Sequence, residues 1–248
     1  MTIPPLSEEN KKKSLSDLST QGFSIIENFL DPAECDRLRG VFDSYIQNSP
    51  GNIQGNPKSD DRIFAAEYVD PVIRDFKYHA TLKDIASTYV GTEQNTLFTM
   101  ANRLIHRPGV NIRSGGRWHR DRKKRQFKSM VYLSDVSPEN GPFSILPTSA
   151  IGSGEYTEEI EKAYFQYDEQ RWDDSAISAF LELVDAQMRV CTASKGTVVL
   201  FDSSLIHSGQ RITAGNRYAM TNYFYAHDEV DLDKVRSKWG LSAGLIEF

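Results

Sequence analysis

The chain has 248 residues, of which 29 are Lys or Arg and 34 are Asp or Glu, so its formal net charge is −5. This mildly acidic balance argues against a nucleic-acid partner, and no apolar run approaches the roughly 18 residues that a membrane helix needs. Two distant cysteines, Cys35 and Cys191, provide no disulfide framework. We therefore expect one cytoplasmic domain spanning 1–248, with neither nucleic acid nor membrane as a partner.

The first third of the chain predicts helices around a short strand. Residues 7–19 are polar and compatible with a helix, and residues 23–26 have the composition of a strand. At Asp31-Pro32-Ala33-Glu34, an N-cap acceptor, a proline at the first helical position and a capping-box glutamate predict a helix start. After a polar loop expected over 51–61, apolar residues at helical spacing predict a second packing helix over 81–90.

From about residue 95 the chain changes to short β-rich segments divided by turn residues. The predicted strands are 97–106, 127–133, 143–146, 197–201 and 218–225. Residues 156–186 interrupt this series with helical composition, and we interpret them as a helical insertion over one sheet edge. The pattern indicates a mainly β core with flanking helices, in the α+β class.

Three residues form a candidate metal site. His119 and Asp121 are two positions apart, and residues i and i+2 of a strand face the same side. This tripeptide is weak evidence alone, but His207 follows a buried-looking strand and offers a third ligand. Two histidines and one carboxylate on one side of an ion suit Fe(II) and leave positions open to substrates. Open positions indicate catalysis rather than a structural metal.

Arg217 lies ten residues after His207 and begins a predicted strand. A return of this length is typical of a hairpin, so Arg217 could enter the same cavity from the neighbouring strand. A guanidinium on a cavity wall suits two-point recognition of a carboxylate. The alternative is an arginine at the surface end of a strand.

The same segments carry a family resemblance, in four motifs that span nearly the whole chain together with the N-terminal sequence from Phe23 to Cys35. The motifs are Trp118-His-Arg-Asp, the segment 127–149, His207-Ser-Gly and Asn216-Arg-Tyr-Ala-Met-Thr. In this order they resemble the phytanoyl-CoA dioxygenase (PhyH-like) family.

The resemblance implies a double-stranded β-helix, the cupin-like jelly roll, that binds Fe(II) and 2-oxoglutarate and activates O2. His119, Asp121 and His207 fall on the family's iron ligands, and Arg217 falls on the residue that pairs with the distal carboxylate of 2-oxoglutarate. The expected reaction oxidises an unactivated C–H bond, usually by hydroxylation, with release of succinate and CO2. Asp121 disfavours chlorination, because related halogenases have a small residue there.

Two further residues are candidates for a contact with the oxoacid or the substrate. Lys128 and Tyr132 share one face of the strand 127–133, and we expect that face to line the cavity. A solvated lysine and a core tyrosine are the alternative. On the preceding strand, the sequence leaves open whether Asn102 or Arg103 faces inward.

A basic loop beside the predicted iron ligands departs from the family pattern; its cations are Arg120, Arg122, Lys123, Lys124 and Arg125. The loop is either a solvated charge run or a docking site for an anionic group on a small-molecule substrate. Two other functions stay open. One is a catalytically silent jelly-roll binding or sensing module, and the other is a zinc hydrolase, which would leave Arg217 without a purpose.

Overall fold

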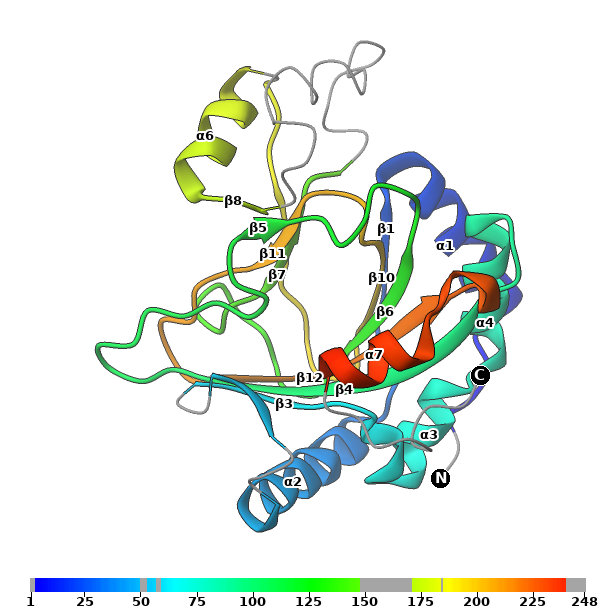
Figure 1. Ribbon diagram of the computed structural model, residues 1–248, viewed down its shortest axis with the longest axis horizontal. Helices are drawn as coiled ribbons and strands as arrows, with labels where there is room; N and C mark the ends of the chain where they lie inside the picture. The colour runs from blue at the N-terminus through cyan, green and yellow to red at the C-terminus, as the bar shows by residue number, and fades with distance from the viewer. Residues whose placement is uncertain (1–2, 50–52, 57–58, 148–170, 184, 240–248) are drawn as a thin grey trace.

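The computed structural model describes residues 3–49, 53–56, 59–147, 171–183 and 185–239. Two antiparallel sheets face each other (Figure 1). The larger sheet contains, in spatial order, β1 (Phe23–Ile26), β10 (Val198–Asp202), β6 (Phe127–Tyr132), β12 (Asn216–Tyr225), β4 (Asn95–Ile105), β3 (Asp60–Ile63) and β2 (Gln54–Asn56). The smaller sheet contains β8 (Arg171–Trp172), β5 (Trp118–His119), β11 (His207–Gly209), β7 (Phe143–Ile145) and β9 (Arg189–Cys191).

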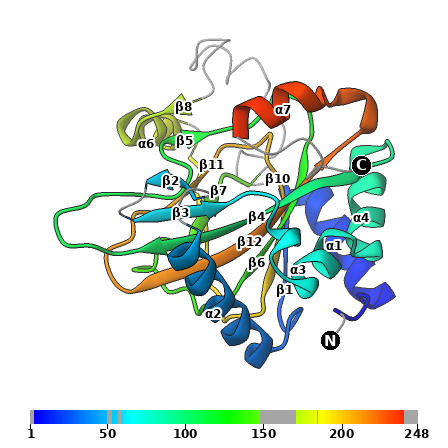
Figure 2. The same cartoon turned by 60° about the horizontal axis from the view of Figure 1, so that its bottom comes forward.

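The helices formed by the first 90 residues pack on the outer side of the larger sheet, in keeping with the predicted α+β class (Figure 2). The helices are α1 (Glu8–Gln21), α2 (Pro32–Asn48), α3 (Pro71–Lys77), α4 (Ala80–Val90), α6 (Asp174–Leu183) and α7 (Leu232–Trp239), with 3-10 turns at Ala66–Tyr68 and His227–Glu229. The start of α2 is the predicted one, because the Asp31 carboxylate accepts the N–H of Ala33 at 2.8 Å. No described helix is both long and apolar enough to cross a membrane.

Strand β6 divides the core into two layers. Phe127 and Val131 point outward and pack under the helices, whereas Met130 and Tyr132 point inward and pack between the sheets. This is the predicted alternation, and it confirms that the face bearing Lys128 is turned toward the smaller sheet. The core layer between the sheets therefore lies on the same face of β6 as Lys128.

The predicted loop at 51–61 is wrong in part, because residues 54–56 and 60–63 form the hairpin β2–β3 at the sheet edge. Asp60 and Asp61 are 3% and 7% exposed. Each carboxylate accepts hydrogen bonds from an arginine, Arg62 at 2.6 Å for Asp60 and Arg103 at 2.8 Å for Asp61. Because the charges are paired, aspartates that predict a solvated loop occupy a buried strand.

The predicted insertion at 156–186 is described from residue 171 onward, and residues 148–170 lie outside the described part of the chain. Within it, α6 is the expected helix and packs Ile177 and Phe180 against Trp118. The Asp174 carboxylate accepts the indole N–H of Trp118 at 3.0 Å. Helix α6 is thereby fixed to β5, the strand that carries His119.

Candidate active site

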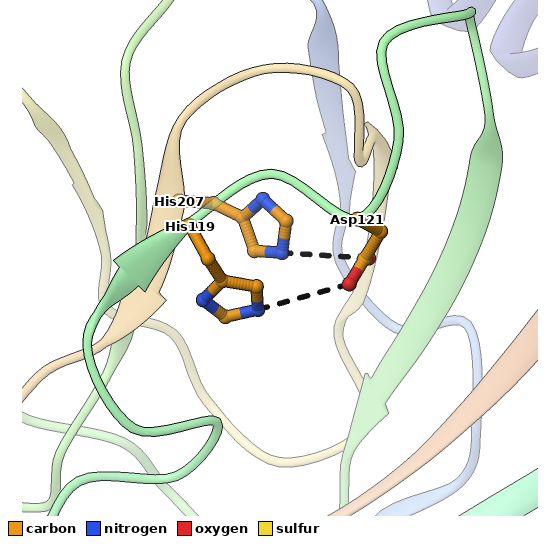
Figure 3. Close-up of side chains that lie close together, drawn as sticks. All are labelled: His119, Asp121 and His207. Carbon is orange, nitrogen blue, oxygen red and sulfur yellow. Dashed lines mark ion pairs between the residues drawn. The ribbon is translucent and has the colours of Figure 1, made fainter. Parts of the chain in front are cut away.

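His119 and His207 are direct register partners on the antiparallel strands β5 and β11. Their ring centroids are 4.4 Å apart, and both imidazoles point toward Asp121 (Figure 3). The Nε2 atoms of His119 and His207 lie 3.8 and 3.7 Å from the two Asp121 carboxylate oxygens. One ligand atom from each of the three residues falls within 4.8 Å of the others, so one ion can contact all three.

The backbone sets the tautomer of both histidines. Nδ1 of His119 lies 2.8 Å from the Arg117 carbonyl, and Nδ1 of His207 lies 2.8 Å from the Leu205 carbonyl. A carbonyl oxygen only accepts, so each Nδ1 carries the proton and each Nε2 keeps its lone pair for a metal. Burial, followed by the neighbouring His207, lowers the pKa of His119 to about 3, and burial also lowers the pKa of His207. Both rings are therefore neutral at neutral pH.

Asp121 supplies the negative charge. It follows β5, where its backbone N–H donates to the Ser203 carbonyl at 2.9 Å. Burial opposes its ionisation, but Lys128, whose Nζ lies 2.5 Å from Oδ2, outweighs this effect and holds the pKa of Asp121 below its usual range. Two neutral imidazole nitrogens and one carboxylate fit Fe(II) with open positions.

His119, Asp121 and His207 line a cavity of about 270 Å³ that Arg217 also enters. Arg217 is 3% exposed; its Nη1 donates to the Gly141 carbonyl and its Nη2 to Asn102 Oδ1 at 3.3 Å. Among the described residues, its Nε has no hydrogen-bond partner. A buried guanidinium with an unused donor favours an anionic ligand, because an unmet buried donor is costly.

The path by which Arg217 reaches this cavity differs from the predicted hairpin. Strand β11 pairs with β5 and β7, whereas β12 pairs with β4 and β6 in the other sheet. The ten residues after His207 therefore cross between the sheets, so that His207 and Arg217 meet from opposite walls.

A family model described as phytanoyl-CoA dioxygenase (PhyH) matches residues 18–219. The chain belongs to the phytanoyl-CoA dioxygenase family. The predicted family is thereby confirmed. The ectoine dioxygenase of Sphingopyxis alaskensis (strain DSM 13593 / LMG 18877 / RB2256) is 24% identical over an alignment of 220 residues, and the match covers 75% of this chain and 66% of that protein. The chain thus spans slightly less than two thirds of this relative.

Solved structures with the same fold support the predicted jelly roll. The epimerase SnoN, in complex with Fe3+, alpha ketoglutarate and nogalamycin RO, superposes with a TM-score of 0.64 at 12% identity, over 88% of this chain and 84% of SnoN. EctD from S. alaskensis, with 2-oxoglutarate and 5-hydroxyectoine, gives 0.62 at 19% identity, over 92% and 81%. The jelly-roll prediction is confirmed, and the predicted class, a 2-oxoglutarate-dependent dioxygenase with Fe(II), agrees with the family.

Arg62, which the sequence analysis missed, is a second arginine of this PhyH-family cavity. Its Nε and Nη2 donate to Asp60 Oδ2 at 3.1 and 2.6 Å, and Asp60 Oδ1 accepts from Asn102. A chain of hydrogen bonds thus runs from Arg217 through Asn102 and Asp60 to Arg62. Asn102 is therefore the inward residue of its pair, while Arg103 bonds Asp61. The sequence would have indicated that Arg62 faces the cavity only if a strand had been predicted over residues 60–63.

Lys128 and Tyr132 share a face but have different surroundings. Lys128 lines the cavity, where its ammonium pairs with Asp121. Tyr132 is fully buried in the core between the sheets, and its hydroxyl donates to the Cys191 carbonyl and accepts the Phe143 N–H, both at 3.0 Å. Among the described residues that line the cavity, Tyr132 is absent. A contact of either residue with an oxoacid stays a prediction.

The basic loop is tied to its surroundings. Arg122 forms an ion pair with Glu229 at 2.7 Å, and the Arg125 guanidinium lies 4.8 Å from the centroid of the Tyr89 ring. The Arg120 guanidinium lies 5.4 Å from the Trp172 ring centroid. These partners offset much of the repulsion that an isolated cluster of cations would have, which weakens the case for this loop as an anion-docking site.

Proposed function

We propose that this PhyH-family protein is an Fe(II)- and 2-oxoglutarate-dependent dioxygenase that hydroxylates an unactivated C–H bond of a small molecule, releasing succinate and CO2. The observation that carries the proposal is that His119, Asp121 and His207 converge in one cavity with the buried, incompletely paired Arg217. The first three would hold Fe(II). Arg217 would hold the oxoacid.

The arginines provide the charge that a dicarboxylate needs. Gly141 and Asn102 fix two of the Arg217 nitrogens, so its planar fork is oriented before a ligand enters. Burial lowers the pKa of Arg217 by destabilising its charge, and a carboxylate would restore the favourable pairing. We propose that this contact anchors the distal carboxylate of 2-oxoglutarate, with Arg62 as the second cation of the same wall.

The remaining residues exclude water and orient the ligands. The rings of Phe143 and Phe201 lie 5.6 and 5.8 Å from the ring of His207 and form an apolar wall behind it. Bound Fe(II) supplies the redox chemistry by which O2 and 2-oxoglutarate oxidise the substrate. The protein's own contribution is to leave coordination positions open and to keep the reacting groups dry.

We infer a small-molecule substrate that carries an anionic group. Ectoine dioxygenase is a relative, and the similar structures contain 5-hydroxyectoine and nogalamycin RO, which are small molecules. Among ionisable groups that line this cavity, the cations are Arg62, Lys128, Arg171 and Arg217, and the carboxylate is Asp121. Asp60 pairs with Arg62, Asp121 pairs with Lys128, and the distal carboxylate of 2-oxoglutarate would pair with Arg217. Arg171, which donates to the Gly115 carbonyl, is the remaining cation of the cavity lining and favours an anion in the substrate.

Succinate formation tests the proposed function. We expect slow succinate release from purified protein given Fe(II), 2-oxoglutarate and O2, and faster release when a metabolite panel, composed of carboxylates and their matched amides, includes the substrate. The variant His207→Ala provides the background rate. Succinate release that is equal in wild type and this variant contradicts the proposal.

A further inference from the structure

Lys128 is a buried cation on the wall of the cavity that contains the proposed metal site. It is the second residue of β6, with Phe201 and Tyr223 as its register partners on the two flanking strands. Its side chain is 6% exposed. The ammonium lies 3.9 Å from the centroid of the Tyr223 ring, whose π face favours a positive charge. Strand packing therefore fixes where this charge is held.

The contact between Lys128 and Asp121 makes the two carboxylate oxygens different. Oδ1 lies 3.8 Å from His119 Nε2 and Oδ2 lies 3.7 Å from His207 Nε2, but Oδ2 also lies 2.5 Å from Lys128 Nζ, which takes up one of its lone pairs. The Lys128 ammonium and the Asp121 carboxylate form an ion pair in which the lysine side chain is buried. A charge-assisted hydrogen bond of this kind is strong enough to hold the carboxylate in one orientation.

We propose that Lys128 is a positioning residue that occupies Asp121 Oδ2 and so restricts Asp121 to binding the metal through Oδ1 alone. The inference rests on the proposed function. Three protein ligand atoms would leave positions on the ion open for 2-oxoglutarate and O2. If both carboxylate oxygens bound the metal, one of these positions would be lost. Lys128 therefore protects the position that the oxoacid or O2 requires.

The test compares neutral and charged replacements of Lys128 by metal and oxoacid binding rather than by turnover. Lys128→Met removes the ammonium and nearly keeps the volume, Lys128→Gln is a second neutral variant too short to reach Asp121, and Lys128→Arg keeps a cationic donor. Each protein is titrated with Co(II), whose visible absorption reports coordination, and then anaerobically with Fe(II) and 2-oxoglutarate, whose complex has a charge-transfer band.

We expect both neutral variants to bind Co(II) with an altered absorption spectrum, and to need at least tenfold more 2-oxoglutarate for half-maximal charge-transfer absorption. Lys128→Arg should restore both readouts toward wild type. Neutral variants that bind metal with wild-type spectra and wild-type 2-oxoglutarate dependence overturn the role of Lys128. If Lys128→Met does not fold, Lys128→Gln decides by the same criteria. Absence of the charge-transfer band in wild type would instead contradict the proposed function.

Discussion

His119 and His207 lie opposite each other across β5 and β11, and each imidazole is hydrogen-bonded to the carbonyl two residues before it in the chain. The register of the strand pair therefore sets the separation of the two proposed metal ligands, and the local backbone of each segment sets the tautomer. A slip of one residue would turn one imidazole to the other face of the sheet. The site is accordingly built by the sheet, with Asp121 added from the loop that follows β5.

Each of the substitutions His119→Ala, Asp121→Ala and His207→Ala should abolish 2-oxoglutarate turnover and leave the protein folded, because each removes one of three protein bonds to the metal. Turnover, bound iron and the thermal midpoint are measured together. His106→Ala, a histidine outside the cluster, is the control and should retain iron. Wild-type turnover in any one of the three ligand variants would refute its assignment.

Arg217→Lys should raise the 2-oxoglutarate concentration for half-maximal rate by about tenfold or more, since an ammonium cannot make the planar two-point contact with a carboxylate. The matched control is Arg103→Lys. Arg103 is on the adjacent strand β4 and bonds Asp61 and Asp43 instead of the cavity. Equal 2-oxoglutarate dependence in the two variants would place the anchor elsewhere, with Arg62 the next candidate.

Gly141→Ala should weaken both stability and oxoacid binding. Gly141 has φ +70°, and an added Cβ would lie 2.9 Å from the Gln210 carbonyl oxygen. The carbonyl of Gly141 itself accepts the hydrogen bond from Arg217, so a shift of this backbone would also move the guanidinium. Gly109→Ala is the control, since φ is +77° but no atom lies within 4 Å of its Cβ. Because φ is positive at both glycines, alanine causes backbone strain of about 1 kcal/mol in both variants. Urea unfolding should show a larger loss for Gly141→Ala, and an equal loss would remove the packing argument.

His79 predicts a pH dependence of stability. Its Nδ1 accepts the Leu82 N–H at the start of α4, its Nε2 donates to the Pro4 carbonyl, and burial lowers its pKa. Below about pH 6.5 the unfolded chain takes up a proton that folded His79 does not, so the free energy of unfolding falls as the pH falls, by at most about 1.4 kcal/mol per pH unit. His79→Asn can cap α4 without titrating.

Urea unfolding of wild type and His79→Asn isolates the contribution of His79 to the pH dependence of stability. The measurements run from about pH 5 to about pH 8, which brackets the ordinary histidine pKa of about 6.5. The variant should have the shallower pH slope. Parallel slopes would mean that His79 takes up the same number of protons in both states, and its buried neutral form would then be disproved.

The sequence predicted those features that depend on local periodicity. The alternation in β6 correctly separated Met130 from Val131. The spacing of His119 and Asp121 correctly brought these two side chains together, although Asp121 lies in the loop after β5 and not on the expected strand. Alternation does not reveal depth along a strand, so Tyr132 could not be distinguished from Lys128 as a cavity residue. The single-domain organisation stays a prediction.

Features that depend on contacts between distant segments could not be predicted from the sequence. Asp60 and Arg62 have the composition of a loop and form a strand because their charges are paired within the folded protein. Arg217 was expected on a neighbouring strand, yet it approaches His207 from the opposite sheet. Pairing partners and sheet crossings are set by tertiary packing, which spacing along the chain does not encode.

If His119, Asp121 and His207 hold Fe(II) in a form that 2-oxoglutarate can bind, an anaerobic titration will detect the complex. Metal-free protein receives one equivalent of Fe(II) and then increasing 2-oxoglutarate, while the visible spectrum is recorded. We expect a saturable charge-transfer band that is absent from His207→Ala and that needs a higher 2-oxoglutarate concentration in Arg217→Lys. A wild-type protein that binds iron but forms no such band would contradict the proposed function.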